Sequence, residues 1–150
     1  MKRFRFNLRP VATVRAYRES QARDAFATAV HHYVEAEEKL ARVRERKSEF
    51  EAALFAGRTD RFQPALEAQT LNAYRRECLE EMECERAVIA ARATMYERRD
   101  AYVDAHRRVE VIQRLEVKAR ASHRRTQNRE EQAEFDDFAG RAAHRKLVSA

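Results

Sequence analysis

The residues best suited to chemistry in this chain are two cysteines and five histidines. Cys78 and Cys84 are six residues apart, which on a helix separates them by about 240° around the axis. They therefore cannot form a disulfide or share a metal ion within one helix, and we expect two free thiols, buried or half-buried. His31 and His32 are adjacent and face different directions on a helix, while the other histidines are far apart in sequence: His106, His123 and His144.

Catalytic combinations of residues are absent from the sequence. The two isolated glycines, Gly57 and Gly140, cannot build a phosphate-binding loop, and no His-Glu-x-x-His motif occurs. We therefore predict that the protein is not an enzyme and has no catalytic residue, no cofactor and no metal site. Two free cysteines also fit a reducing compartment.

The elements that position these residues must be helices. Charged residues make up 37% of the 150 residues and the hydrophobic set 44%, with only two Gly, two Pro and no Trp. Sheets and α/β folds need Gly and Pro in their turns, so the composition argues against both classes. No apolar run approaches the ~20 residues that span a bilayer, and no signal peptide is evident. The sequence predicts a soluble, cytoplasmic protein.

Charge is distributed unevenly along the chain. Residues 1–18 contain six of the 31 basic residues and no carboxylate, whereas the remaining 132 residues hold 25 basic and 25 acidic side chains. The net charge of +6 therefore belongs to a basic N-terminal arm. Such an arm suits an anionic protein surface or anionic lipid. We expect no nucleic-acid partner, because none of the usual nucleic-acid-binding patterns is present.

Helix-breaking residues divide the chain into two long segments. Gly and Pro occur only at Pro10, Gly57, Pro64 and Gly140, and the segments between them are rich in Ala, Glu, Arg and Leu. We predict one domain over 1–150, with a basic arm at 1–10, a helix at 11–56, a turn at 57–64 and a helix at 65–147. As continuous helices, the runs 11–56 and 65–139, which contain no Gly or Pro, would be about 69 and 112 Å long. Helices of these lengths do not fit a compact globule, so they must form an antiparallel hairpin.

A seven-residue apolar repeat runs through both segments. Its positions alternate steps of three and four residues, which is typical of a left-handed coiled coil. The predicted fold is therefore all-α, an elongated antiparallel two-helix coiled coil with a longer second helix. The repeat comprises Ala22, Phe26, Ala29, Tyr33, Ala36, Leu40, Val43, Lys47, Phe50 and Leu54, then Cys84, Val88, Ala91, Met95, Arg98, Tyr102, Ala105, Val109 and Ile112.

Folding the chain about Asp60 or Arg61 predicts which residues face each other. Tyr33 should meet Val88, and Phe26 should meet Met95. Lys47 interrupts the first repeat and should lie near Tyr74 and Glu77. The interruptions of the two repeats, Lys47 in the first and Glu77 and Glu81 in the second, should therefore lie near one another, as a register-fixing charge pair or as a partner site. An acidic group on the second helix should pair internally with basic residues of the first; these are Glu77, Glu80, Glu81, Glu83 and Glu85, and Arg42, Arg44, Arg46 and Lys47.

The second helix is too long to be covered by the first. Residues 113–147 extend past it, and Phe135, Phe138 and Ala142 share one helical face there, with Leu147 nearby. Uncovered apolar side chains of this kind are typical of a protein contact. The alternative is that they pack on the apolar residues of the arm; the two readings are compatible.

Both ends of the chain resemble a known family. Residues 4–10 (Phe-Arg-Phe-Asn-Leu-Arg-Pro), followed by Arg15, Arg18 and Glu19, resemble the opening of the flagellar export protein FliJ family. Residues 128–146 resemble the family's C-terminal pattern Asn-Arg-x-x-Gln-x-x-x-Asp-x-Phe-Ala-x-Arg-Ala-Ala-x-Arg-Lys nearly position by position.

The resemblance implies a non-enzymatic component of the flagellar type III export apparatus. Members are antiparallel coiled coils similar to the stalk of rotary ATP synthases. They dock into the hexameric ring of the export ATPase, promote its assembly and activity, and link it to the transmembrane export gate and to substrate chaperones. The implied location is the cytoplasmic face of the inner membrane at the flagellar base.

The resemblance also implies two sets of contact residues. The ATPase set consists of Asn128, Arg129, Gln132, Asp136, Phe138, Ala139, Arg141, Ala142, Arg145 and Lys146. The export-gate set consists of Val43, Phe50 and Tyr74. Three other functions remain open: a homodimeric structural coiled coil, the equivalent stalk of a virulence type III secretion system, and a nucleic-acid binder that acts through the arm. The homodimer predicts a stable dimer without partners, and the nucleic-acid binder predicts steeply salt-dependent binding to any duplex.

Overall fold

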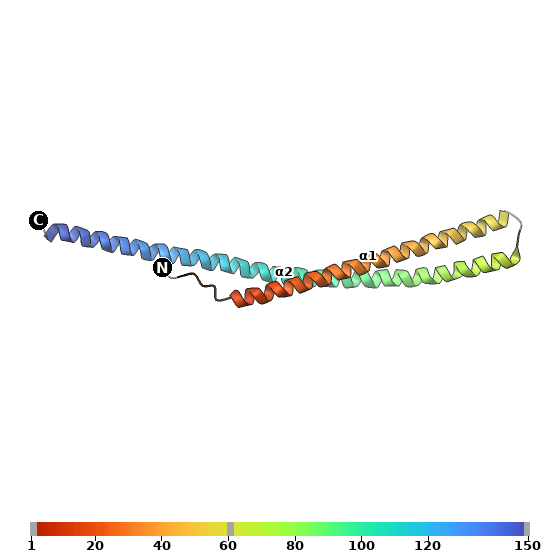
Figure 1. Cartoon of the computed structure of the whole chain (residues 1–150), viewed down its shortest axis with the longest axis horizontal. Coiled ribbons are helices and arrows are strands. Elements are labelled where there is room, and N and C mark those ends of the chain that lie inside the picture. The colour runs from red at the N-terminus through yellow and green to blue at the C-terminus, as the bar shows by residue number, and fades with distance from the viewer. Residues whose placement is uncertain (1–2, 60–61, 149–150) are drawn as a thin grey trace. The chain divides into compact units, whose positions relative to one another are not determined.

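The computed structural model consists of two helices joined by a short connection (Figure 1). It describes the backbone of residues 3–59 and 62–148, and the side chains of residues 3–58 and 62–142. Helix α1 spans Arg9–Thr59 and helix α2 spans Pro64–Val148, and the described residues include no strand. The predicted all-α fold, with a longer second helix, is confirmed.

Local sequence explains where the helices begin. Pro64 is the first residue of α2, a position that needs no N–H donor and is helped by the fixed φ of proline. Glu67 lies in the first turn, where a carboxylate interacts favourably with the helix dipole, and its N–H donates to the Gln63 carbonyl at 3.0 Å. Pro10 lies in the first turn of α1 for the same reason.

The prediction of a helix stop at Gly57 is wrong. Helix α1 continues through Gly57 to Thr59, and no described residue has a positive φ. A glycine ends a helix when it adopts the left-handed conformation, whereas a glycine with helical dihedrals only weakens the helix, by about 1 kcal/mol relative to alanine. Leu54, Phe55 and Ala56 lead into Gly57 without interrupting the helix, and α1 therefore extends beyond residue 56.

The chain divides into two units. The hairpin unit is Ser20–Asp104, and the terminal unit combines Met1–Glu19 with Ala105–Ala150. In the hairpin unit α1 and α2 lie side by side and antiparallel around a core of Leu40, Val43 and Cys84, against which Val88 packs. Val43 is the most deeply buried of these residues, with 1% of its surface exposed.

The predicted seven-residue repeat forms the interface between the helices. All ten repeat positions of α1 are buried or half-buried, and so are eight of the nine positions of α2. Arg98 is the exception, because a guanidinium is hydrated more favourably outside the interface. Small side chains such as Ala29, 6% exposed, let the two backbones approach closely.

The predicted pairing of residues is displaced. Tyr33 accepts a hydrogen bond from Arg92 at 3.1 Å rather than meeting Val88, and Phe26 stacks on Tyr102 rather than on Met95. The partners lie one to two turns further along α2 because helical side chains lean toward the N-terminus of their own helix. In an antiparallel pair this moves the α1 side chains away from the connection and the α2 side chains toward it.

In the terminal unit, the first turns of α1 and the extended arm pack on α2. Ile112 is buried, with 4% of its surface exposed. The arm precedes Arg9, and its Phe4 ring meets the His123 ring edge-on at 5.5 Å, with the Arg120 guanidinium 5.5 Å from the Phe4 centroid. Within this unit α2 continues past the arm to the C-terminal segment (Figure 1).

Candidate functional site

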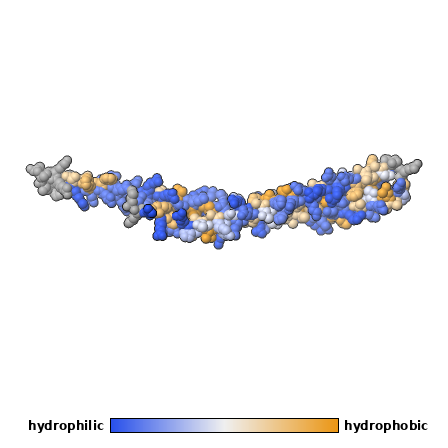
Figure 2. Space-filling view, in the orientation of Figure 1, coloured by the Kyte–Doolittle hydropathy of each residue, from blue (hydrophilic) through white to orange (hydrophobic). Residues whose placement is uncertain are grey.

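The C-terminal segment of α2 is an uncovered helix. From Asn128 to Ala142 every side chain is exposed, and Figure 2 shows apolar residues on its visible face, next to the C-terminal end. We call residues 128–142 the tail. It holds eight of the ten residues predicted to contact the ATPase: Asn128, Arg129, Gln132, Asp136, Phe138, Ala139, Arg141 and Ala142. The other two, Arg145 and Lys146, lie outside the described side chains.

Two aromatic side chains dominate the tail. Phe135 and Phe138 are three residues apart, so they are neighbours on one face of the helix, and they are 72% and 74% exposed. Burying a phenylalanine side chain is worth about 1.5–3 kcal/mol, and this gain is unrealised in the free chain. The arm does not provide it, because Phe4 packs on His123 and Arg120 instead. The tail can therefore offer two aromatic anchors to a partner.

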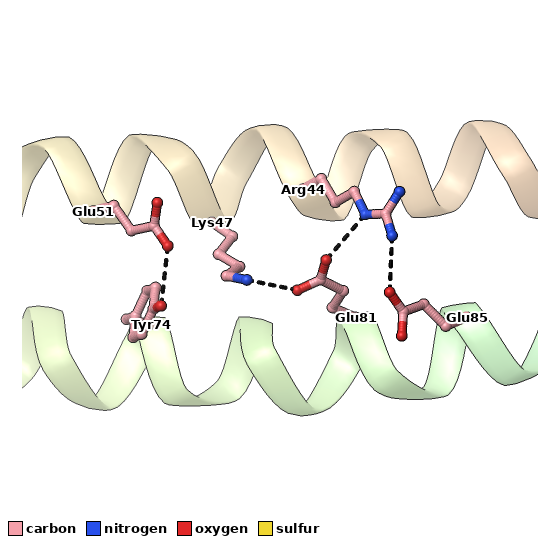
Figure 3. A network of polar contacts seen from close by, with 6 residues as sticks. All are labelled: Arg44, Lys47, Glu51, Tyr74, Glu81 and Glu85. Carbon is pink, nitrogen blue, oxygen red and sulfur yellow. Dashed lines mark hydrogen bonds and ion pairs between the residues drawn. The ribbon is translucent and has the colours of Figure 1, made fainter.

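The predicted export-gate residues differ in accessibility. Val43 is enclosed in the core, so it can affect a gate contact only through packing. Phe50 and Tyr74 are half-buried. The Tyr74 hydroxyl donates to Glu51 Oε1 at 3.0 Å across the two helices, and this bond, together with Cys78 and burial, raises the pKa of Tyr74 to about 12 (Figure 3). The structure brings Phe50 and Tyr74 to the part of the hairpin unit near the connection but keeps Val43 inside.

A charge network links the helices between Val43 and Phe50. Lys47 Nζ and Arg44 Nε approach the two oxygens of Glu81 at 2.8 and 3.0 Å, and Arg44 Nη2 reaches Glu85 at 2.8 Å (Figure 3). Only 15% of the Glu81 side chain is exposed. Its hydrogen bonds from Lys47, and then from Arg44, lower the pKa of that carboxyl group below its usual value.

Further cross-helix ion pairs lie about one turn nearer the connection on α2. Arg46 Nη2 lies 3.1 Å from Glu77 and 3.3 Å from Glu80. Together these contacts confirm the predicted internal pairing for Arg44, Arg46 and Lys47, whereas Arg42 lies 3.9 Å from Glu38 of its own helix. The pairing requires α1 and α2 to align in one register, because a shift would separate several ion pairs at once.

A second cross-helix ion pair lies in the terminal unit. His106 Nδ1 of α2 is 2.6 Å from Glu19 Oε1 of α1, and His106 Nε2 is 3.8 Å from Glu110. The hydrogen bond with Glu19 is the main cause that raises the pKa of His106 above its ordinary 6.5. Nearby, Arg15 Nη1 donates to the carbonyl of Arg108 at 3.0 Å.

This pair predicts a pH-dependent stability of the terminal unit. Because the pKa of His106 is higher in the folded chain, its contribution is fully present below pH 6.5 and is lost as the pH rises through the folded pKa. We expect the thermal unfolding midpoint to decrease as the pH is raised from 6 to 9, and this decrease to be smaller in the Glu19→Gln variant. The matched control is Glu35→Gln, whose partner His31 lies on the same helix. An equal pH dependence in both variants would contradict the assignment.

The arm and the adjoining parts of α1 and α2 line an open cleft of about 950 Å³ in the terminal unit. Arg5, Arg9 and Arg120 contribute positive charge to its lining, Glu116 contributes one carboxylate, and Phe4 contributes an aromatic ring. The cleft has no paired catalytic groups. Within the described ranges there is also no cluster of three or more potential metal ligands, and no helix is long and apolar enough to cross a membrane.

The sequence analysis missed one apolar surface. Leu79, Met82, Ile89 and Tyr96 are large apolar residues of α2 that point away from α1 and are 45–69% exposed. Their spacing repeats the three-and-four pattern of the interface, offset around the helix. A search for a second apolar repeat on the same helix would have found them.

A comparison of the sequence with models of known protein families finds one family that matches nearly the whole chain. The sequence model of the flagellar FliJ protein matches residues 4–147, which include the arm from Phe4 onward and the complete tail. No curated protein and no solved structure matches the chain. The match confirms the resemblance that the two ends indicate: the chain belongs to the flagellar FliJ family.

Proposed function

We propose that the chain is the coiled-coil stalk of the flagellar export ATPase. Membership of the FliJ family makes it a component of flagellar protein export. Our proposal adds that the chain docks into the ring of the export ATPase, promotes assembly of the hexamer and raises its ATPase activity. The family's role is structural rather than enzymatic, so the chain would act through contacts and not through chemistry of its own.

The uncovered tail is the observation that carries the proposal. Every side chain of the tail is exposed, and the two aromatic residues Phe135 and Phe138 have no cover within the described chain. Arg141 lies three residues beyond Phe138 and so on a neighbouring part of the helix surface. The tail also carries five carboxylates and two arginines, so a partner with apolar pockets whose rim holds both basic and acidic groups would suit it. The interior of an ATPase ring is the site that the family resemblance implies for this segment.

The proposed mechanism is differential contact. A ring of identical subunits in different nucleotide states presents non-equivalent surfaces to one inserted helix, and the tail would bind some of these states better than others. Such a ligand shifts the populations of the states by its difference in affinity. The continuous α2 helix would transmit the contact beyond the ring, since every turn is held by its own backbone hydrogen bonds.

The remaining partners belong to the same proposal. Phe50 and Tyr74 would contribute to the export-gate contact, with Val43 supporting them from the core. Substrate chaperones would bind as further partners. The chain would then sit at the cytoplasmic face of the inner membrane, at the flagellar base, held there peripherally by the gate and the ATPase.

The test is the ATPase rate of the export ATPase from the same organism. We expect stimulation by the full chain and none by a chain that ends before Asn128. Phe138→Ala should reduce the stimulation at least about fivefold, because it removes an aromatic side chain whose burial in the ring would contribute more than about 1 kcal/mol to binding. The matched control is Phe55→Ala: Phe55 is also 74% exposed but lies near the end of α1.

Three outcomes are informative. Stimulation lost in the truncated chain and in Phe138→Ala, but kept in Phe55→Ala, supports docking through the tail. Equal loss in both phenylalanine variants would contradict a tail-specific contact. No stimulation by the full chain would contradict the proposal that the chain activates the export ATPase, although the family membership would stand.

A further inference from the structure

The hairpin unit has an apolar face that α1 leaves uncovered. We define the outer face of α2 as six residues at alternating steps of three and four: Leu79, Met82, Arg86, Ile89, Ala93 and Tyr96. Five of the six are apolar, and all are exposed. Ile89, the large apolar residue nearest the middle, is 69% exposed. The outer face of a simple two-helix coiled coil is normally polar, so this pattern calls for a partner helix.

The outer face lies on the opposite side of α2 from the interface with α1. At about 100° per residue, its centre is roughly 150° around the helix from Cys84 and Val88, which pack against α1. Helix α1 of the same chain therefore cannot cover it. The three-and-four spacing is that of a coiled-coil repeat, so its occupant is expected to be another helix with the same spacing.

We propose that the occupant is the outer face of a second copy of this chain, packed antiparallel about a two-fold axis between Arg86 and Ile89. In this arrangement Leu79 lies opposite Tyr96 of the second copy, and Met82 lies opposite Ala93. Each pair occurs twice, as in any isologous interface. Large residues near the ends of the face and a large–small pair within it allow the two helices to interdigitate.

The charges beside the outer face are self-complementary in this arrangement. Arg76 and Glu97 occupy the same flank and lie opposite each other between the two copies. Glu85 and Arg92 do the same on the other flank. Arg75 lies opposite Asp100 at each end of the face. At these flanking and end positions no like charges are brought together, which is the pattern that selects a partner in coiled coils.

Arg86 determines the direction of the pairing. In a parallel arrangement the two Arg86 side chains would lie side by side in the new interface and repel each other. In the antiparallel arrangement Arg86 lies opposite Ile89, where its aliphatic stem can pack while the guanidinium reaches water. A single polar residue at an interface position commonly fixes register and orientation at some cost in affinity.

Contacts within the chain already order one flank. Glu85 is held by Arg44 at 2.8 Å, and Arg92 is held by the Tyr33 hydroxyl at 3.1 Å. The other flank is less constrained: Arg76 Nε donates only to the Asn72 carbonyl, one turn earlier on its own helix, at 3.5 Å. Arg76 and Glu97 are therefore the better pair for a charge-exchange experiment.

The expected affinity is modest. The outer face spans about 26 Å of helix, so the dimer would bury less surface than a typical stable protein–protein interface. We therefore expect a dissociation constant of about 10–100 µM. Sedimentation equilibrium of the full chain, from about 5 to 200 µM, should show a monomer–dimer equilibrium. Ile89→Lys should weaken the dimer at least about tenfold. Val117→Lys is the matched control, because Val117 is 68% exposed but lies outside the outer face.

Charge exchange tests the antiparallel pairing directly. Arg76→Glu alone and Glu97→Arg alone each place like charges opposite one another and should weaken self-association. Mixing these two variants restores opposite charges at both positions, so the mixture should form heterodimers more tightly than either variant forms homodimers. Circular dichroism of each variant verifies that helix content is unchanged.

The proposal has clear contrary results and does not depend on the proposed function, since no ATPase is present in the experiment. A chain that remains monomeric at 200 µM would overturn it. A dimer that is unaffected by Ile89→Lys would overturn the choice of face. A mixture of the two charge variants that associates no better than its components would overturn the antiparallel pairing.

Discussion

Replacing Val43 with aspartate is expected to unfold the hairpin unit. Val43 is 1% exposed and packs with Leu40 and Cys84, so the new carboxylate would lose its hydration among side chains that carry no charge. The cost of such a substitution is about 4 kcal/mol or more, a large part of the stability of a typical domain. Urea unfolding followed by circular dichroism at 222 nm measures the effect as a large fall in midpoint or as a chain unfolded in buffer.

The control for this experiment is Val34→Asp. Val34 is on the same helix but 43% exposed, so its carboxylate would remain hydrated, and we expect a change within about 1 kcal/mol. Similar losses in the two variants would mean that helix propensity, rather than packing between α1 and α2, limits stability. The comparison also bears on the gate contact, because a loss of gate binding in a Val43 variant must be separated from unfolding.

Reversing the charge of Glu81 is the second change with a large expected effect. Glu81→Lys would place a third cation beside Lys47 and Arg44, both of which now bond the Glu81 carboxylate. Because only 15% of the Glu81 side chain is exposed, water screens the repulsion poorly. We expect a marked fall in the thermal midpoint at pH 7, and a shift of the helices out of register within the hairpin unit.

The loss of stability in Glu81→Lys should depend on pH. The pKa of Glu81 is lowered from its ordinary 4.5 in the folded chain, so its contribution to stability is present above pH 4.5 and is lost as the pH falls through the folded pKa. The difference between the natural chain and Glu81→Lys should therefore narrow in acid.

The matched control is Glu38→Lys, because Glu38 is 63% exposed and its nearest basic partner, Arg42, is 3.9 Å away on the same helix. Equal effects of the two reversals at pH 7 would show that the network contributes nothing specific to the register.

The sequence alone determined which residues face the partner helix. The seven-residue repeat is a local property: once a segment is helical, the angle between successive side chains is constant, and the apolar positions define one face. Ala29, Leu40 and Cys84 were predicted to be interface positions, and they are buried. The unequal lengths of the helices place Phe135 and Phe138 beyond α1, but the sequence left open whether the arm packs on them; in the structure both are exposed and Phe4 packs on His123 instead.

The tertiary structure decided how the two faces meet. Pairing depends on where the chain reverses and on the lean of side chains in both helices, and neither is encoded in a single repeat. Hence Tyr33 meets Arg92 rather than Val88, and Phe26 stacks on Tyr102 rather than on Met95. Phe4 packs on His123 for a related reason: the arm has no periodic pattern, so only the surface available on α2 decides where its ring is buried.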